Sequence, residues 1–169
     1  TSLLHNILDL AWIGADKNIS KGKSFSLSDT LSELNEIAIK LSAKKQLRIK
    51  STIQPDITVF GDEGKITRAI LNIIDNAIKY TSKKKIIYIS LRKLKDEAII
   101  EIKDGGIGIS KSDLKHVFER FYRGSKTSKT LGSGLGLAIS QGIINAHKGQ
   151  IKVDSAIGKG TTVKIILPL

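Results

Sequence analysis

Apolar residues recur along the chain with two different periods, and each period predicts one kind of element. A repeat near 3.6 residues predicts helices over residues 3–17, 28–44, 62–80 and 135–147, with a shorter helix near 112–118. Short runs of apolar and β-branched residues predict strands over residues 25–27, 48–53, 57–60, 86–91, 98–103, 150–155 and 161–167. Helices and strands therefore alternate along most of the chain.

Polar residues at the borders of these runs predict where elements begin and end. Ser28 is expected to cap the second helix, Asp62 to start the third, and Gly149 to end the last one. A turn is expected at 55–56, and the polar stretch over 17–24 is the best candidate for a linker.

The order of the elements predicts a folded domain over residues 21–169, preceded by a helical segment and linker over residues 1–20. The apolar face of that first helix is so wide that it needs partners, as the end of a bundle helix does. The strand pairs within 86–103 and 150–167 are expected to be antiparallel. We therefore predict an α/β two-layer sandwich, in which helices cover one face of a mixed, mostly antiparallel sheet.

Composition narrows the class of protein without changing this fold. The 169 residues are enough for one core, and no run of about 18 apolar residues predicts a membrane span. The absence of Cys excludes disulfides and Cys-ligated zinc. The net charge is +12, but the lysines are spread along the whole chain, so nucleic-acid binding is the weaker interpretation. No signal peptide opens the chain. Because it begins at Thr1 and lacks Met, we expect an excised fragment or a processed product.

The helix over 62–80 carries an unusual polar stripe. Asn72, Asn76 and Lys79 fall together on the side opposite its apolar residues, and Tyr80 lies at the edge of that stripe. Two amide oxygens one turn apart suit a hard cation that already holds phosphate oxygens, and an ammonium suits the same phosphates. The alternative is an exposed polar face that happens to include two Asn.

Two glycine-rich segments follow. The first glycine segment, residues 104–109, places Asp104 at the end of a strand, where a carboxylate can accept a hydrogen bond from the amine of adenine. The second glycine segment, residues 132–137, opens a helix, whose first N–H groups can bind phosphate. It does not complete the dinucleotide-binding pattern, because Leu137 stands where the last glycine is required. Each segment has a structural alternative, a tight turn and a hinged loop respectively.

The segment between them, residues 117–124, has the features of a lid. Phe118 and Phe121 are spaced to hold a mobile segment against the core, and Arg120 and Arg123 are then able to reach phosphates. An exposed basic loop is the alternative.

Taken together, these segments resemble the ATP-binding domain of sensor histidine kinases, within the superfamily of type-II topoisomerases, heat-shock chaperones of ninety kilodaltons and MutL-type ATPases. Residues 72–81 resemble the N box, 104–109 the first glycine box, 118–123 the F box, 132–138 the second glycine box and 158–161 the last one. All five occur in the family's order. Residues 2–17 are similar to the end of the family's second dimerisation helix, and the implied fold is of the Bergerat type.

The resemblance implies a role for each matched position. Mg²⁺ would be held by Asn76 directly and by Asn72 through water. The phosphates of ATP would meet Lys79, Arg123 (rather than Arg120), Gly132, Gly134, Leu135, Gly136 and Leu137. The adenine would lie against Tyr80, Asp104, Gly106, Gly108, Ile109 and Thr161, with the Asp104 carboxylate on its amine and Thr161 supporting that carboxylate through water.

One position predicts the reaction. ATP-hydrolysing members of the superfamily carry a Glu four residues before the metal-binding Asn, whereas this chain has Asn72, which cannot deprotonate water. Neutral imidazole needs no such base, so transfer to a histidine is favoured. None of His5, His116 and His147 fits the family's acceptor, which we therefore expect to lie outside this chain.

The resemblance further implies partners and a location. These are the protein's own dimerisation domain with its phospho-accepting histidine, a response-regulator receiver domain, and a second copy in a homodimer. The domain would lie in the cytoplasm, in a protein anchored in the bacterial inner membrane. The alternatives are a serine-directed kinase or ATPase of the same superfamily, a module that has lost nucleotide binding, and a nucleic-acid binder.

Overall fold

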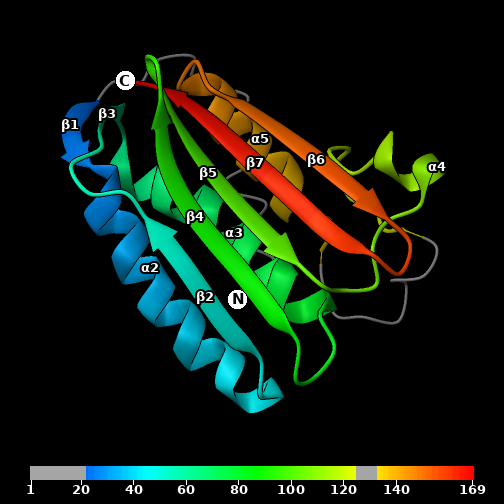
Figure 1. Ribbon diagram of the computed structural model, residues 1–169. Coiled ribbons are helices and arrows are strands. Elements are labelled where there is room, and N and C mark those ends of the chain that lie inside the picture. Colours follow the sequence, from blue (N-terminus) through cyan, green and yellow to red (C-terminus); the bar gives the residue numbers. More distant parts are fainter. Residues whose placement is uncertain (1–21, 125–132) are drawn as a thin grey trace.

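The computed structural model describes residues 22–124 and 133–169, and in them one five-stranded sheet is covered by helices on a single face (Figure 1). The strand order is β2-β4-β5-β7-β6, with bounds Arg48–Ile53, Ile86–Leu94, Glu97–Asp104, Gly160–Pro168 and Gln150–Ala156. Only β2 and β4 are parallel. The helices α2, α3 and α5 span Leu27–Ser42, Glu63–Tyr80 and Gly136–Ala146. The predicted two-layer sandwich with a mixed, mostly antiparallel sheet is confirmed.

A second, two-stranded sheet and two short helical pieces are the other elements in the described part of the chain. Strands β1 (Lys23–Ser26) and β3 (Thr58–Gly61) pair antiparallel, apart from the larger sheet. The 3-10 turn η1 spans Ala43–Lys45, and α4 spans Lys111–Leu114. The helix predicted near 112–118 is therefore reduced to one turn, after which the chain continues in turns.

The start of α2 differs from the sequence prediction. The N-cap is Ser26, whose Oγ accepts a hydrogen bond from Asp29 N at 3.2 Å, so the assignment of Ser28 as the cap was wrong. Ser28 is buried, and its hydroxyl donates to Gln54 O at 2.8 Å and accepts from Ile57 N at 3.0 Å. Both serines have a side chain able to cap. The contact with the turn between β2 and β3 decides between them, and local sequence does not reveal that contact.

Helix α3 forms as its sequence predicts. Asp62 caps it by accepting a hydrogen bond from Lys65 N at 3.1 Å. Its buried residues are Ile66, Ala69, Ile70, Ile73, Ile74, Ala77 and Ile78, the apolar face read from the sequence. Because this face is fixed on the sheet, the polar stripe of the same helix is turned away from it.

The predicted helix over 3–17, and with it the division between residues 1–20 and 21–169, lies in a part of the chain outside the described residues. Among the residues that are described, no helix combines the length and apolar character that crossing a membrane requires.

Candidate nucleotide-binding site

The polar stripe of α3 faces the start of α5. Asn72, Asn76, Lys79 and Tyr80 are all half-buried, whereas Asp75 on the same helix is exposed. Asn72 Nδ2 donates to Gly136 O at 3.4 Å. No hydrogen bond to the Asn76 side chain comes from residues 22–124 or 133–169. The stripe is thus a partly covered flank between two helices, and its amide groups are available to a ligand held there.

Lys79 and Tyr80 form the end of this flank. The Lys79 ammonium lies 5.3 Å from the centre of the Tyr80 ring. Partial burial lowers the pKa of Lys79, with Asp75 opposing this shift and the positive charges of Arg123 and Lys45 adding to it. Burial also raises the pKa of Tyr80, and Arg123 opposes that rise. The lid arginine is therefore close enough to act electrostatically on both residues.

Asp104 lies at the end of β5 with 9% of its surface exposed. Its Oδ1 accepts hydrogen bonds from Gly106 N at 2.7 Å and from Thr161 N at 3.2 Å. Within the described parts of the chain no donor reaches its Oδ2. Burial raises the pKa of Asp104, while the two N–H groups and Lys85 oppose the rise. One oxygen of a fixed carboxyl group is thus left for a ligand donor.

The contact from Thr161 is made by its backbone rather than its side chain. The Thr161 hydroxyl lies 2.9 Å from Ser155 Oγ, and Ser155 also accepts from Ile109 N at 2.8 Å and donates to Gly160 O at 2.7 Å. Sequence reasoning missed Ser155, because nothing in its neighbourhood marks a serine that joins segments 46 residues apart.

The first glycine segment is hydrogen-bonded both to the end of α3 and to the turn between β6 and β7. Ile107 N donates to Tyr80 O at 3.3 Å, and Gly158 N donates to Ile107 O at 2.8 Å. A Cβ on Gly106 would lie 2.6 Å from Tyr80 O, closer than such atoms approach in proteins. The protein's own backbone therefore requires a glycine here, whatever ligand the segment also meets.

The described part of the second glycine segment, from residue 133, leads into α5. Gly134 has φ +71, and a Cβ on it would lie 2.8 Å from Tyr122 O. Leu135 is fully buried and Leu137 packs against the core, so the start of α5 is firmly held. No side chain of residues 22–124 or 133–169 caps this helix, and its first N–H groups suit an anion. Gly132 lies outside the described residues.

The lid segment is held differently from what its two phenylalanines suggest. Phe118 packs against the core, but Phe121 is 60% exposed, so the expectation that both anchor the segment was wrong. Phe121 lies in a turn with φ +62. Besides Phe118, Tyr122 holds the segment, because its hydroxyl donates to Asp113 Oδ1 at 2.7 Å. Arg120 and Arg123 are both exposed, and only Arg123 influences Lys79 and Tyr80.

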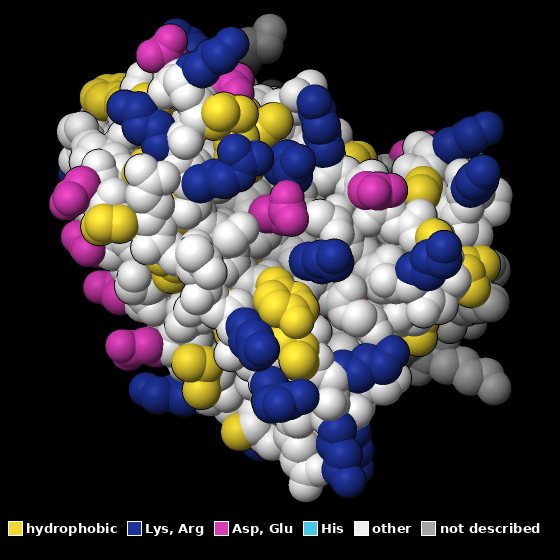
Figure 2. All heavy atoms as spheres, in the orientation of Figure 1, with side chains coloured by type: hydrophobic (Ala, Val, Ile, Leu, Met, Phe, Trp, Pro, Cys, Tyr) yellow, Lys and Arg dark blue, Asp and Glu magenta, His cyan; other side chains and the backbone are white. Residues whose placement is uncertain are grey.

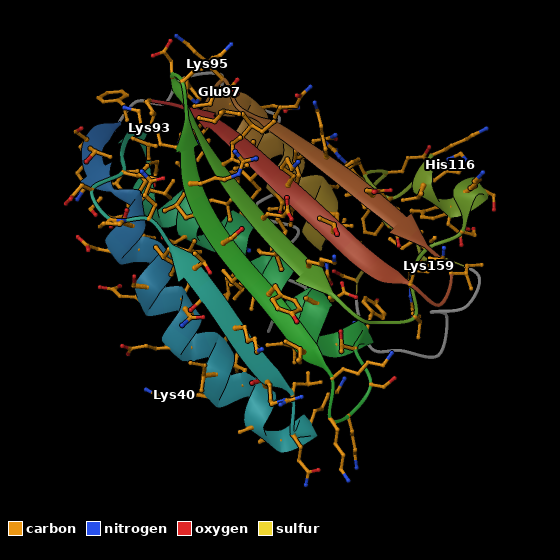
Figure 3. All side chains as sticks on the ribbon, viewed as in Figure 1. Lys40, Lys93, Lys95, Glu97, His116 and Lys159 are labelled. Atoms are coloured by element: carbon orange, nitrogen blue, oxygen red, sulfur yellow. The ribbon has the colours of Figure 1, made fainter. Side chains whose placement is uncertain are left out.

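The two described histidines make structural contacts. His116 is exposed beside α4 (Figure 3), with Nδ1 2.7 Å from Glu119 Oε1. His147 is buried at the end of α5, where its Nε2 accepts from Asp62 N at 3.0 Å and its Nδ1 lies 2.7 Å from Ile143 O. His147 thus ties α5 to the start of α3, while His5 lies in the part that is not described.

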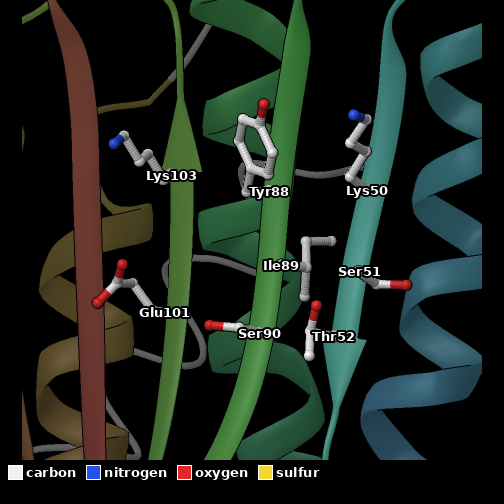
Figure 4. Close-up of a pocket in the computed structure, with 8 residues that line it drawn as sticks. All are labelled: Lys50, Ser51, Thr52, Tyr88, Ile89, Ser90, Glu101 and Lys103. Atoms are coloured by element: carbon white, nitrogen blue, oxygen red, sulfur yellow. The ribbon is translucent and has the colours of Figure 1, made fainter.

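The bare face of the sheet carries a separate hollow. It has a volume of about 670 Å³ and is lined by Lys50, Ser51, Thr52, Tyr88, Ile89, Ser90, Glu101 and Lys103 (Figure 4). On this face lysines and arginines are scattered among fewer acidic side chains (Figure 2). The candidate residues of the nucleotide site lie on α3, on α5 and at the ends of strands. This hollow on the sheet face is therefore not part of the candidate nucleotide site.

Three comparisons with known proteins agree with one another. Residues 61–169 match the family described as "Histidine kinase-, DNA gyrase B-, and HSP90-like ATPase". The chain is 34% identical over 172 residues to the sensor histidine kinase RppB of Synechocystis, covering 100% of this chain and 38% of RppB. It is 40% identical over 171 residues to the histidine-protein kinase ArlS of Staphylococcus aureus, covering 97% of this chain and 37% of ArlS. The chain thus spans less than two fifths of the length of these relatives.

Solved structures give the same result. The mycobacterial sensor histidine kinase MprB superposes with a TM-score of 0.72 at 29% identity, over 86% of this chain and 96% of that one. Full-length ShkA, crystallised with AMPPNP, superposes with a TM-score of 0.87 over 99% of this chain and 35% of that one; at 24% identity this supports the fold alone. The chain therefore belongs to the family of histidine kinase-, gyrase B- and HSP90-like ATPases, and within it to the ATP-binding catalytic domains of sensor histidine kinases.

Proposed function

We propose that this domain binds ATP with Mg²⁺ and presents the γ-phosphoryl group to a histidine on the dimerisation domain of the same protein. The proposal rests on the proximity of three features: the polar flank of α3, the start of α5 and the first glycine segment. The polar flank of α3 faces the uncapped start of α5, and the end of α3 contacts the segment that fixes the Asp104 carboxylate.

The adenine would be recognised at the first glycine segment. Asp104 Oδ2 would accept from the exocyclic amine. Two backbone N–H groups already hold Oδ1, which supports this role for the other oxygen. Tyr80 would flank the base. The other residues proposed to lie against it are Gly106, Gly108, Ile109 and Thr161. Guanine presents a carbonyl where adenine has the amine, so the carboxylate would disfavour it.

The triphosphate would lie between α3, α5 and the lid segment. Asn76 would bind Mg²⁺ directly and Asn72 through water, since amide oxygens suit this hard cation. When bound, Mg²⁺ would neutralise the phosphate oxygens and align the γ-phosphoryl group. Lys79 and Arg123 would bind phosphate oxygens with their positive charges, and the backbone from Gly132 to Leu137 would supply N–H groups.

The type of residue that accepts the phosphoryl group follows from the lack of a general base at position 72. Asn72 is neutral and already donates to Gly136 O, so it has no means of activating water or a hydroxyl group. A neutral imidazole attacks phosphorus with its own lone pair. The acceptor histidine would then pass the phosphoryl group to the receiver domain of a response regulator. We further propose that the whole protein is a homodimer, anchored in the bacterial inner membrane with this domain in the cytoplasm, and that nucleic acid is not a partner.

The first test is a titration of the 169-residue chain with ATP, with and without Mg²⁺. We expect Asn76→Ala to weaken binding about tenfold or more in the presence of Mg²⁺ and to change it little without the metal, because the amide acts through the cation. Asn145→Ala is the matched control, since Asn145 is exposed on α5, away from this flank. Equal loss with and without Mg²⁺ would contradict the metal-binding role.

The second test separates the kinase from its relatives. Alone, the chain is expected neither to label itself from radioactive ATP nor to release phosphate steadily. Adding the separately produced dimerisation domain of the same protein should give acid-labile, alkali-stable phosphate on that domain. Phosphate release by the isolated chain that is lost in Asn72→Ala would instead favour an ATPase, and acid-stable label on a protein substrate would favour a serine-directed kinase.

A further inference from the structure

Lys45 is not among the residues proposed to meet ATP or Mg²⁺, but its side chain reaches the end of α3. It lies in η1, directly after α2, and is half-buried. Its Nζ donates to Lys79 O at 2.7 Å, to Ile78 O at 2.9 Å and to Thr81 O at 3.5 Å. These carbonyls are more than 30 residues away in sequence, so the contact is a tertiary link between two helices.

The contact matches the chemistry of a lysine closely. The last four carbonyls of a helix have no partner within the helix, and the end of a helix carries partial negative charge. An ammonium has three donors on one atom, and here they meet three carbonyls. An arginine spreads its donors over a planar fork and does not converge on one point in this way.

The last turn of α3 is also where the two halves of the proposed ATP site meet. Lys79 and Tyr80, which are proposed to meet the phosphates and the base, both belong to this turn. The carbonyl of Tyr80 accepts from Ile107 N at 3.3 Å, and it lies so close to Gly106 that no side chain fits there. Gly106 in turn donates to Asp104 Oδ1 at 2.7 Å. A displacement of this turn would therefore move the lysine, the tyrosine and the carboxylate together.

We propose that Lys45 is a positioning residue for ATP, fixing the last turn of α3 so that Lys79, Tyr80 and the first glycine segment share one geometry. Its charge also offsets the negative end of the helix, which would otherwise face the bound triphosphate. The role in binding rests on the proposed function, whereas the link to Ile107 does not.

The test uses the absence of Cys from the chain. In Lys45→Cys the single thiol is alkylated either with 2-bromoethylamine, which restores an ammonium at nearly the same position, or with iodoacetamide, which leaves a neutral group. We expect the neutral form to bind Mg²⁺-ATP about tenfold more weakly, and the ammonium form to return to within about threefold of the wild type. Lys44→Cys, treated identically, is the control, because Lys44 is exposed next to Lys45.

A second readout does not depend on ATP. Without nucleotide, the Ile107 amide should exchange with solvent about tenfold faster in the neutral form than in the ammonium form, because its acceptor on Tyr80 is no longer held. Ile89→Val, at a buried position on β4, serves as a variant with a comparable loss of Tm from elsewhere in the core.

These outcomes are distinct. Weaker binding and faster exchange in the neutral form, reversed by the ammonium and absent in Ile89→Val, would support the proposal. Unchanged exchange and unchanged affinity in the neutral form would overturn it, as would equal changes in Ile89→Val. If the wild type itself does not bind ATP, the proposed function fails, and the exchange of Ile107 alone decides the positioning role of Lys45.

Discussion

Asp104→Asn is expected to weaken ATP binding by about a hundredfold while leaving the free chain at least as stable as the wild type. The substitution keeps the shape and an oxygen that Gly106 N and Thr161 N can still reach. In place of Oδ2, however, it puts an NH₂ group opposite the amine of adenine. Two donors then face each other in a buried site, and the charge that strengthens the original hydrogen bond is gone.

The expected stability follows from the direction of the pKa shift. Burial raises the pKa of Asp104 above that of an exposed carboxyl group. A carboxyl group whose pKa is higher in the folded state contributes stability below its unfolded pKa, and that contribution is lost as pH rises through the folded pKa. At neutral pH the ionised group therefore costs stability, and the neutral amide removes this cost. For the same reason, ATP affinity should fall as the pH is lowered toward the raised pKa of Asp104.

The measurement is a pair of experiments on each variant, thermal unfolding without nucleotide and calorimetric titration with Mg²⁺-ATP at neutral pH. Asp154→Asn is the control, since Asp154 is exposed on β6 and should change neither quantity. A variant of Asp104 that binds ATP as tightly as the wild type would remove the basis for adenine recognition at this site. A large loss of Tm without nucleotide would instead show that the carboxylate is needed for folding.

Much of the fold could be predicted because the sequence of α3 has a clear N-terminal cap and a regular apolar face. A cap at Asp62 and an apolar face repeating over 18 residues fix both the position of the helix and the side it buries. The same regularity fixes the opposite flank, so that Asn72, Asn76 and Lys79 could be grouped by helical spacing alone. Their half-burial was not predictable, because it depends on α5, whose start lies 64 residues later in the chain than Asn72.

The supporting contacts of the site could not be predicted for the same reason. Lys45, Ser155 and Tyr122 act through hydrogen bonds to groups in other segments of the chain, and a lone lysine, serine or tyrosine carries no local signal of such contacts. For Phe121 the sequence predicts a contact that does not form. Its spacing from Phe118 predicts that both rings are buried on one side, but the chain turns at Phe121 with a positive φ and the ring is exposed. Periodicity predicts which face is buried in a regular element, and it loses that power where the chain turns.

Gly108→Ala is expected to destabilise the fold by at least about 3 kcal/mol, whereas Gly158→Ala should cost only about 1 kcal/mol. The two glycines have nearly the same backbone conformation, with φ +70 and φ +76. They differ in their surroundings. A Cβ on Gly108 would overlap sterically with the carbonyl oxygen of Ala156. Nothing in the described residues lies within 4 Å of a Cβ on Gly158.

The comparison isolates steric contact from backbone strain. Non-glycine residues already adopt positive φ in this chain, among them Lys84 and Lys148, so that conformation alone does not require a glycine. At Gly108 the first glycine segment and the turn between β6 and β7 must separate to admit a methyl group. That movement would also disturb the contacts that hold Ile109 and Thr161 through Ser155.

Thermal unfolding of both variants against the wild type is the measurement. For a chain of this length about 3 kcal/mol corresponds to a loss of roughly 6–12 °C in Tm, and about 1 kcal/mol to roughly 2–4 °C. Equal losses in the two variants would mean that the positive φ sets the requirement for glycine at position 108. The packing of the first glycine segment against the turn between β6 and β7 would then not be the cause. A loss confined to Gly108→Ala would show that the packing of the first glycine segment against the turn between β6 and β7 sets that requirement.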